Sequence, residues 1–283
     1  MTSSFQRELT AYGPTATYPT PTEAEALAYC RRLAKTHYEN FSVATLLLPR
    51  PLVPHFHVIY SYCRWADDLG DETGGGERAL SLLAWWRGEL MRCYDGTATH
   101  PVMIALGPTI RRFGIPSAPF LDLIKAFEQD QVVTRYESYS QLEAYCRWSA
   151  NPVGRLVLYL CECFNEQSAV LSDDICTGLQ LANFWQDVSR DSEIGRVYLP
   201  AEDRVRFGYS DDDLAARRFT PAFRELMRFE VERARGLLER GLGLIPLVPK
   251  NVRPDIELLP AAAWRSFATS RQSITMSGAR GPW

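Results

Sequence analysis

The segment Tyr60-Ser-Tyr-Cys-Arg-Trp-Ala-Asp-Asp-Leu-Gly-Asp-Glu72 indicates the class of fold to which this chain belongs. Its aromatic and apolar residues recur with the periodicity of a helix that buries one face. Asp67 and Asp71 are four residues apart, so a helix places both carboxylates on the same side. Prolines precede this segment and glycines 74–76 follow it, so we expect a helix over about residues 53–71.

A second segment, Gln180-Leu-Ala-Asn-Phe-Trp-Gln-Asp-Val-Ser-Arg-Asp191, repeats the pattern. Asp187 and Asp191 are again one helical turn apart, and Asn183 and Gln180 lie one and two turns earlier. Stacked carboxylates repel each other, so a helix that carries such a pair commonly binds a cation. The alternative is that each pair lies on a solvated helix face. The existence of two pairs favours a ligand, as do the aromatic residues around them: Tyr60, Tyr62, Trp65, Phe184 and Trp185.

The two pairs have the chemistry of a magnesium site. Mg²⁺ prefers hard oxygen ligands and is usually bound by one or two carboxylates together with substrate phosphates. Two acidic helix faces across a cleft would hold a cluster of Mg²⁺ ions, and a diphosphate would bridge them. Such metals neutralise the charge that develops on a departing diphosphate.

The rest of the chain also has helical periodicity, and β signals are scarce. Thr22 and Glu25 form a capping box that opens a helix near Glu23, with Ala26, Leu27, Cys30 and Leu33 expected to point inward. Capping residues and prolines delimit further helices, which we expect over about residues 78–94, 101–112, 117–131, 140–164, 172–191 and 221–243, with a short one that starts at Ser210 with Asp213. The prediction is one all-α domain of about ten helices. Residues 1–21 are expected to form a flexible lead, residues 22–258 the domain, and residues 259–283 an atypical tail.

The composition excludes several classes of protein. The 283 residues carry a formal net charge of −3, which gives no electrostatic reason to bind nucleic acid. No apolar run reaches the roughly 20 residues of a membrane-spanning helix, and the first residues do not have the pattern of a secretory signal. The seven cysteines are odd in number and form no Cys-x-x-Cys motif, which favours reduced thiols and a cytoplasmic location. No Gly-x-Gly-x-x-Gly fingerprint is present, so a Rossmann nicotinamide site is not expected.

The paired Asp-x-x-x-Asp motifs, with Gln180-Leu-Ala-Asn183 before the second, resemble those of the squalene/phytoene synthase family. The resemblance runs from about Ala28 to Leu258 and implies a single-domain isoprenoid synthase fold around a central cavity. It also implies a Mg²⁺-dependent enzyme that acts on a prenyl diphosphate. The metal ligands implied by the resemblance are Asp67, Asp71, Asn183, Asp187 and Asp191.

The resemblance also implies roles for residues beyond the aspartates. Arg64 and Arg196 would contact the diphosphate, because a guanidinium group suits phosphate oxygens. The alternative for Arg64 is a surface salt bridge with a nearby carboxylate. Phe41, Gln180 and Tyr198 would line the cavity near the reacting carbons, although Phe41 and Tyr198 could instead be ordinary core residues.

The stretch Tyr145-Cys-Arg-Trp-Ser-Ala-Asn-Pro-Val-Gly154 departs from the usual family pattern. Together with Glu39-Asn-Phe41, it resembles the bacterial hydroxysqualene synthase branch, which converts presqualene diphosphate and water to hydroxysqualene and diphosphate. Pro152 is expected to kink the helix. Trp148 would stabilise a carbocation, and Asn151 would hold the attacking water in an apolar cavity. The alternative is that Asn151-Pro152 is only a helix irregularity.

Two other functions remain open. The chain could condense two prenyl diphosphates as a presqualene diphosphate, squalene or phytoene synthase, or it could be a non-catalytic assembly factor of the same family. The hydroxysqualene synthase prediction implies that NADPH is not required and that a presqualene diphosphate synthase is the functional partner. Because the product is a hydrocarbon-rich lipid, we also expect transient contact with the inner face of a membrane.

The last residues differ in character from the rest. Residues 260–283 have weak helical periodicity and end in a segment rich in Ser and Gly, where family members continue with an amphipathic helix. Back-translation in another frame yields SRGGLAILRNIEAIDYDVWGARPV, which has a clean apolar stripe. We therefore hypothesise a frameshift near Leu259, with loss of the last core helix.

Overall fold

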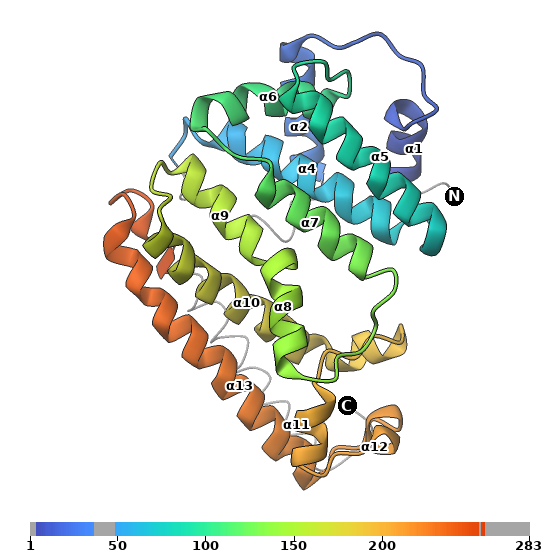
Figure 1. The fold of residues 1–283 in the computed structure, drawn as a ribbon, viewed down its shortest axis with the longest axis vertical. Helices are drawn as coiled ribbons and strands as arrows, with labels where there is room; N and C mark the ends of the chain where they lie inside the picture. The colour runs from blue at the N-terminus through green and yellow to red at the C-terminus, as the bar shows by residue number, and fades with distance from the viewer. Residues whose placement is uncertain (1–3, 37–48, 255, 258–283) are drawn as a thin grey trace. The chain divides into compact units, whose positions relative to one another are not determined.

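The computed structural model describes residues 4–36, 49–254 and 256–257 (Figure 1). Helices dominate these residues, and their only β pairing is an isolated bridge between Arg135 and Val197. The predicted all-α class is confirmed. None of the helices in the described part of the chain has the length and hydropathy needed to cross a membrane.

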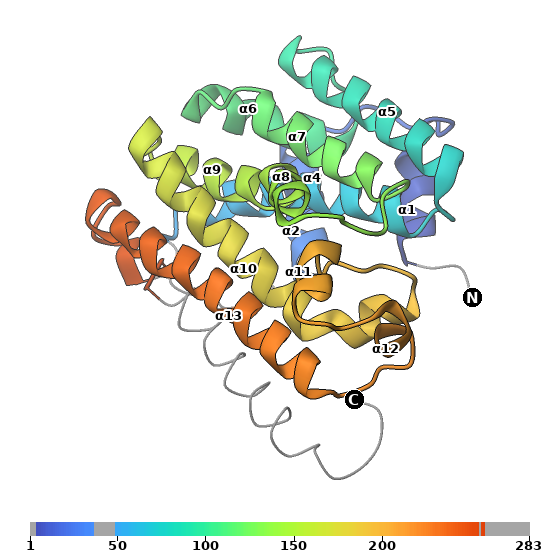
Figure 2. The same cartoon turned by 60° about the horizontal axis from the view of Figure 1, so that its bottom comes forward.

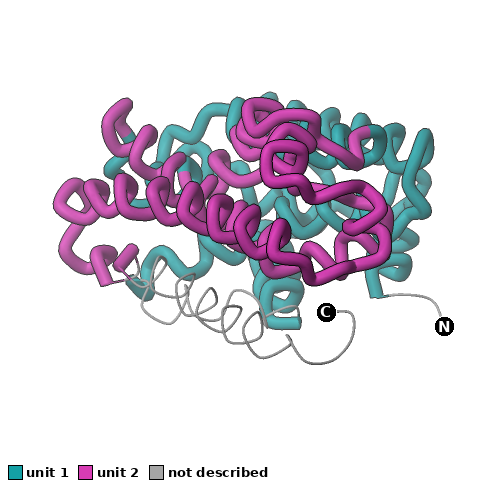
Figure 3. Tube along the Cα trace, turned by 90° about the horizontal axis from the view of Figure 1, so that it is seen from below, with its two compact units in different colours: residues 1–132, 155–164 teal, residues 133–154, 165–283 magenta. Residues whose placement is uncertain are grey.

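The chain forms two compact units, which Figure 3 shows in different colours. Unit 1 comprises residues 1–132 and 155–164, and unit 2 comprises residues 133–154 and 165–283. Each unit is described separately below.

Unit 1 is a helical bundle in which α4 (Val53–Asp71) is the central helix (Figure 1). Its Trp65 is buried and stacks on Trp86, with 5.3 Å between ring centroids, and its Tyr62 packs edge-on against Phe120. Burial of such large rings contributes much of the stability of a helical core. The helices around α4 are α2 (Glu23–Thr36), α5 (Gly76–Tyr94), α6 (Pro101–Phe113) and α7 (Ala118–Gln129).

The ends of several unit 1 helices follow the sequence signals. The Thr22 hydroxyl accepts from the backbone N–H of Glu25 (3.3 Å), and the Glu25 carboxylate accepts from the Thr22 N–H (2.8 Å). This is the predicted capping box, and it satisfies backbone donors that the first helical turn leaves free. Gly114 ends α6 with φ = 60°, a left-handed conformation that favours glycine.

Unit 2 is built on the long helix α10 (Glu166–Glu193), which lies beside α13 (Pro221–Gly241) in both Figure 1 and Figure 2. Helix α8 (Tyr139–Ser149) also packs on α10. The shorter elements are α11 (Ala201–Arg206), α12 (Asp211–Ala215) and the 3₁₀ helix η2 (Leu242–Leu247). Ser210 and Asp213 form a capping box at the start of α12, where a short helix was predicted.

Two helix boundaries differ from the prediction. Helix α10 begins at Glu166 and not near Ser172, because Asn165 and Ser168 form a reciprocal capping box that starts the helix two turns earlier. The single helix expected over residues 140–164 is divided into α8 and α9 (Asn151–Leu160). Pro152 lies in the first turn of α9, where its missing N–H costs nothing, so the predicted kink is a complete break.

Residues 1–21 were predicted to be a flexible lead, and this prediction was wrong for residues 4–12. These residues form α1 (Ser4–Tyr12), whose Phe5 packs edge-on against Trp65, and Glu8 accepts a hydrogen bond from the Tyr29 hydroxyl at 2.8 Å. Leu27 was expected to point inward on α2, but it is 36% exposed. The frameshift hypothesis concerns residues 259–283, which lie outside the described residues.

Candidate active site

The first aspartate pair lies on the polar side of α4. Asp71 is exposed, and the Asp67 side chain is 41% exposed. Tyr60 is half-buried and feels the charge of Asp67, but the other two aromatic residues expected around these carboxylates, Tyr62 and Trp65, are buried in the core of unit 1. They hold the helix in place, and the periodicity of α4 then presents Asp67 and Asp71 to solvent.

Arg64 forms ion pairs with the carboxylates of its own helix. Its Nε donates to Asp68 Oδ2 at 2.9 Å, and its terminal nitrogens lie 3.3 Å from Asp67 and 3.5 Å from Glu72. The salt bridge that the sequence left open for Arg64 is therefore present. Contact between Arg64 and a diphosphate stays a prediction.

Asp68 is a residue that the sequence reasoning missed. Its side chain is only 3% exposed, and burial raises its pKa to about 7, although Arg64 lowers it. Its spacing of four from Arg64 is the signal that could have identified the pair. Since Asp68 fixes the guanidinium beside Asp67, it contributes to the geometry of the first motif.

The second aspartate pair lies near the end of α10 in unit 2. Asp187 is exposed and Asp191 is half-buried. Burial and the neighbouring Asp187 charge raise the pKa of Asp191 to about 6, while Arg196 and Arg190 lower it. The two carboxylates therefore hold a concentration of negative charge that a cation would stabilise.

The segment after α10 is fixed by backbone hydrogen bonds within unit 2. The Arg196 N–H donates to the Asp191 carbonyl at 2.9 Å, and the Val197 N–H donates to the Thr134 carbonyl at 2.7 Å. These bonds hold Arg196 next to the second aspartate pair. Arg196 and Asp191 also line one small crevice, together with Phe184, Val188, Ser192, Val197, Tyr198, Leu199 and Leu214.

Tyr198 belongs to an aromatic cluster. Its ring stacks on Phe184 with 3.8 Å between centroids and an interplanar angle of 8°, and it also stacks on Tyr136 at 5.8 Å. Tyr145 completes the cluster, 6.2 Å from Tyr198. Tyr136 and Tyr145 were not singled out from the sequence, because nothing in a one-dimensional pattern relates them to residue 198.

Trp148 and Asn151 lie at the break between α8 and α9. Trp148 is 36% exposed, whereas Asn151 is 4% exposed. The Asn151 Oδ1 accepts a hydrogen bond from the Thr177 hydroxyl of α10 at 2.9 Å. Asn151 is thus a buried polar side chain with a fixed orientation, which is more than an irregularity of the helix.

The remaining predicted residues are distributed as follows. Gln180 is half-buried and Asn183 is exposed on α10, on the turns before Asp187. Unit 1 therefore carries Arg64, Asp67 and Asp71. The predicted site residues in unit 2 are Trp148, Asn151, Gln180, Asn183, Asp187, Asp191, Arg196 and Tyr198. Phe41 lies outside the described residues.

The model of one protein family, squalene/phytoene synthase, matches residues 34–268. The chain belongs to the squalene/phytoene synthase family. This family processes prenyl diphosphates, so the chain is a member of a family of prenyl-diphosphate enzymes.

Solved structures and curated proteins of the family agree with this membership. The chain is similar to the crystal structure of squalene synthase HpnC from Alicyclobacillus acidocaldarius, with a TM-score of 0.86, 41% identity, and coverage of 92% of this chain and 97% of that one. A dehydrosqualene synthase structure matches with a TM-score of 0.81 and 26% identity over 89% and 88% of the two chains. Phytoene synthase from Arthrospira platensis is 30% identical over 89% of this chain and 84% of its own length.

The side chains fit a family that binds diphosphate through metal ions. Among the described residues, no group of three or more His, Cys, Asp or Glu side chains forms a complete metal site. Each aspartate pair instead supplies two carboxylates, which is the number that Mg²⁺ usually takes when phosphates and water complete its coordination. Burial, followed by the charge of Asp187, raises the pKa of Asp191, and a cation bound between the two carboxylates would offset their repulsion.

Proposed function

We propose that this protein is a hydroxysqualene synthase, which converts presqualene diphosphate and water to hydroxysqualene and diphosphate. The observation that carries the proposal is the likeness to squalene synthase HpnC, at 41% identity over nearly the full length of both chains. The two helix-borne aspartate pairs and the buried Asn151 support the same reaction.

Five residues would hold Mg²⁺ in this enzyme: Asp67, Asp71, Asn183, Asp187 and Asp191. The bound metal would neutralise charge on the leaving diphosphate. Arg64 and Arg196 would donate hydrogen bonds to the diphosphate oxygens, and a guanidinium group can do so with two parallel bonds. In the free protein Arg64 is held by Asp68, so its guanidinium is already oriented.

The hydrocarbon would be held by apolar and aromatic side chains. We assign Phe41, Gln180, Tyr198 and Trp148 to this lining, and the face of Trp148 would stabilise the carbocation by a cation–π interaction. When the C–O bond to diphosphate breaks, its electron pair leaves with the diphosphate. A water oxygen then bonds to the cationic carbon, and the water loses a proton.

Asn151 is assigned to hold that water. Because its Oδ1 accepts from Thr177, its amide nitrogen is the group that would donate to the water oxygen. The water would keep a lone pair for attack on the carbocation. A buried water needs two or more polar partners, and the Asn151 amide nitrogen would supply one of them.

Product analysis tests the reaction. Presqualene diphosphate incubated with the protein and Mg²⁺, without NADPH, should give hydroxysqualene, and H₂¹⁸O should label its hydroxyl group. Asp67→Ala and Asp187→Ala should each lower diphosphate release by at least about 100-fold, because metal neutralisation contributes several kcal/mol to the barrier. Consumption of only farnesyl or geranylgeranyl diphosphate would contradict the proposal.

The water site has its own test. Asn151→Ala should lower the fraction of alcohol among the products, whereas Gln141→Ala on the exposed side of α8 should leave it unchanged. Mass spectrometry of the extracted lipids measures this fraction. An unchanged alcohol fraction in Asn151→Ala would remove Asn151 from the mechanism.

A second candidate is a phytoene synthase or another synthase that condenses two prenyl diphosphates. It is favoured by the curated relatives from Arthrospira platensis and Synechocystis, which are named phytoene synthases and are 30% and 31% identical to the chain. A non-catalytic assembly factor is the third candidate, and the four aspartates argue against it. Under the first proposal, a presqualene diphosphate synthase would supply the substrate, and NADPH would not be needed.

A further inference from the structure

A cationic groove lies in unit 1, on α2 and the beginning of α4. It encloses a cavity of about 1290 Å³, and none of the described residues that line it is assigned to the reaction. The described residues that line it are Ala24, Leu27, Ala28, Arg31, Arg32, Lys35, Thr36, Arg50, Val53, Pro54 and His57. They include four permanent cations, one histidine and no carboxylate.

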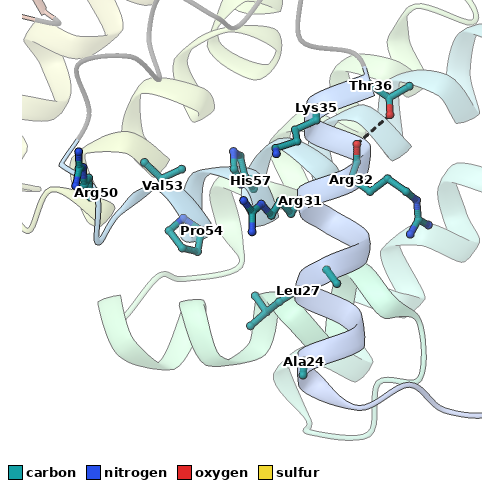
Figure 4. Close-up of a pocket in the computed structure, with 11 residues that line it drawn as sticks. Ala24, Leu27, Arg31, Arg32, Lys35, Thr36, Arg50, Val53, Pro54 and His57 are labelled. Carbon is teal, nitrogen blue, oxygen red and sulfur yellow. Dashed lines mark hydrogen bonds between the residues drawn. The ribbon is translucent and has the colours of Figure 1, made fainter.

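Two of the four cations of this groove, Arg31 and Lys35, lie near His57, whereas Arg50 lies apart from them (Figure 4). Figure 4 shows Arg31 and Lys35 extending toward His57, whereas Arg32 points away from it. Burial lowers the pKa of His57, and the charges of Arg31 and Lys35 lower it further, which shows that the three side chains share one electrostatic environment. Within the described residues no carboxylate pairs with Arg31, Lys35 or Arg50.

Arginines elsewhere in the described chain are commonly neutralised. Arg87 pairs with Glu128 at 2.7 Å, and Arg240 pairs with Asp174 at 3.1 Å. The groove is also locally basic in a chain whose formal net charge is −3. An unneutralised cluster of this kind attracts anions over about a Debye length.

The groove has an apolar end as well as a cationic one. Leu27 is 36% exposed, and Ala24, Ala28 and Pro54 are exposed beside it. Ala24, Leu27 and Ala28 occupy the earlier turns of α2, and Arg31 and Lys35 occupy its later turns, so an apolar and a cationic surface follow each other along this helix. Such a surface complements a molecule with a phosphate group and a hydrocarbon chain.

We propose that this groove docks the protein on anionic phospholipid at a membrane surface, with phosphates on Arg31, Lys35 and Arg50 and acyl carbon against Leu27. Anionic leaflets attract clusters of Lys and Arg at their surface, and apolar side chains next to the cluster add hydrophobic contact. Docking there would keep the protein at the membrane, from which it would take its prenyl lipid substrate. The site does not depend on which prenyl diphosphate the chain converts.

Vesicle co-sedimentation of the full chain tests this docking. Binding should be strong to phosphatidylcholine vesicles that contain phosphatidylglycerol, weak to phosphatidylcholine alone, and reduced by salt. Each cation contributes about fivefold to such partition, so Arg31→Gln with Lys35→Gln should weaken it roughly 25-fold. The charge-preserving double variant Arg31→Lys with Lys35→Arg should retain binding.

The controls separate this site from net charge and from soluble anions. Arg7→Gln with Arg78→Gln removes two exposed charges from other helices and should change binding by less than about twofold. Equal binding by the parent and by Arg31→Gln with Lys35→Gln would overturn the proposal. Release of the parent from vesicles by micromolar inorganic diphosphate would also overturn it, because the groove would then be a site for soluble diphosphate.

Discussion

Asp68 shows how a single buried side chain can organise a motif that is otherwise exposed. It lies between Asp67 and Asp71 in sequence, yet its side chain turns to the interior and holds Arg64. The charge-assisted hydrogen bond is half shielded from solvent, so it is worth more than a surface ion pair. Residue 68 is therefore a positioning residue, whereas Asp71 is exposed and the Asp67 side chain is 41% exposed.

Replacement of Asp68 should destabilise the fold measurably. Asp68→Ala removes the buried partner of Arg64 and should lower the free energy of unfolding by about 2 kcal/mol, the range for a hydrogen bond to a charged group. Glu72→Ala removes the exposed partner of the same guanidinium and should cost less than about 0.5 kcal/mol. Urea denaturation measures both values. Equal losses in the two variants would show that burial of Asp68 adds nothing.

The pairing of α10 with α13 depends on glycine at close approaches. A Cβ on Gly241 would lie 2.4 Å from Ile175 Cγ1 and 3.1 Å from the Leu171 carbonyl oxygen, both on α10. A Cβ on Gly236, in the same helix α13, would meet nothing closer than the Arg240 guanidinium at 3.8 Å. The sequence shows two glycines in one helix, and the packing gives them opposite roles.

The two glycines should therefore respond oppositely to alanine. Gly241→Ala forces the helices apart and should destabilise the protein by about 1–3 kcal/mol. Gly236→Ala improves helix propensity without a clash and should stabilise it by about 0.5–1 kcal/mol. Thermal and urea unfolding provide the comparison. Stabilisation by Gly241→Ala would mean that the α10–α13 contact is looser than described.

A buried charged network joins α11 to α13. Arg233 donates to Glu230 and to Asp203 at 2.8 Å each, and its guanidinium lies 4.0 Å from the Tyr139 ring centroid. Burial raises the pKa of Glu230 to about 8, and Arg233 opposes this shift. The network secures α11, which directly follows the Arg196–Tyr198 segment of the candidate site.

This network makes stability depend on pH. The folded-state pKa of Glu230 is above the ordinary value, so the stabilisation from its proton is full below about pH 4.5 and is lost as the pH rises through about 8. Glu230→Gln should remove that loss, which is at most about 1.4 kcal/mol per pH unit for one proton. Glu232→Gln, at an exposed ion pair on the same helix, should leave the pH profile unchanged. Identical profiles for the parent and Glu230→Gln would contradict this role.

Each of the two units carries one aspartate pair, and the two pairs can bind either one ligand together or two ligands separately. Our proposed function requires both pairs to bind the same Mg²⁺–diphosphate complex. A ligand that binds only the folded state raises its stability, by about 2.7 kcal/mol at 100 times its Kd. If the two pairs share one ligand site, substitution of a single aspartate in either pair should remove the stabilisation by the ligand. If the pairs form two separate sites, such a substitution should remove only part of it.

Thermal unfolding with Mg²⁺ and inorganic diphosphate distinguishes these arrangements. The two ligands together should raise the Tm of the parent by on the order of 5 °C, and either alone should raise it less. With a shared site, Asp67→Asn or Asp187→Asn should each abolish the joint effect, whereas Asp122→Asn, at a surface ion pair, should retain it. Retention of about half the shift in each site variant would indicate two independent sites and would contradict the proposed mechanism.

Local sequence patterns were sufficient for most of the helices and for the helix faces that carry the aspartates. The bounds of α4, the capping boxes at Thr22 and Ser210, and the family membership all follow from residues within a few positions of one another. This is because helix periodicity and capping act over three or four residues. The capping box of Asn165 and Ser168, which starts α10, is a local signal of the same kind.

Contacts between distant residues could be found only from the packed chain. The Asn151–Thr177 hydrogen bond, the Phe184–Tyr198 stack and the burial of Asp68 depend on which helix faces meet, and side chains at many positions set that jointly. The cationic groove likewise combines Arg31 of α2 with His57 of α4. The spacing of residues within a segment determines where a helix forms and which of its faces is polar. The helix against which each apolar face packs is determined by packing interactions throughout the tertiary structure.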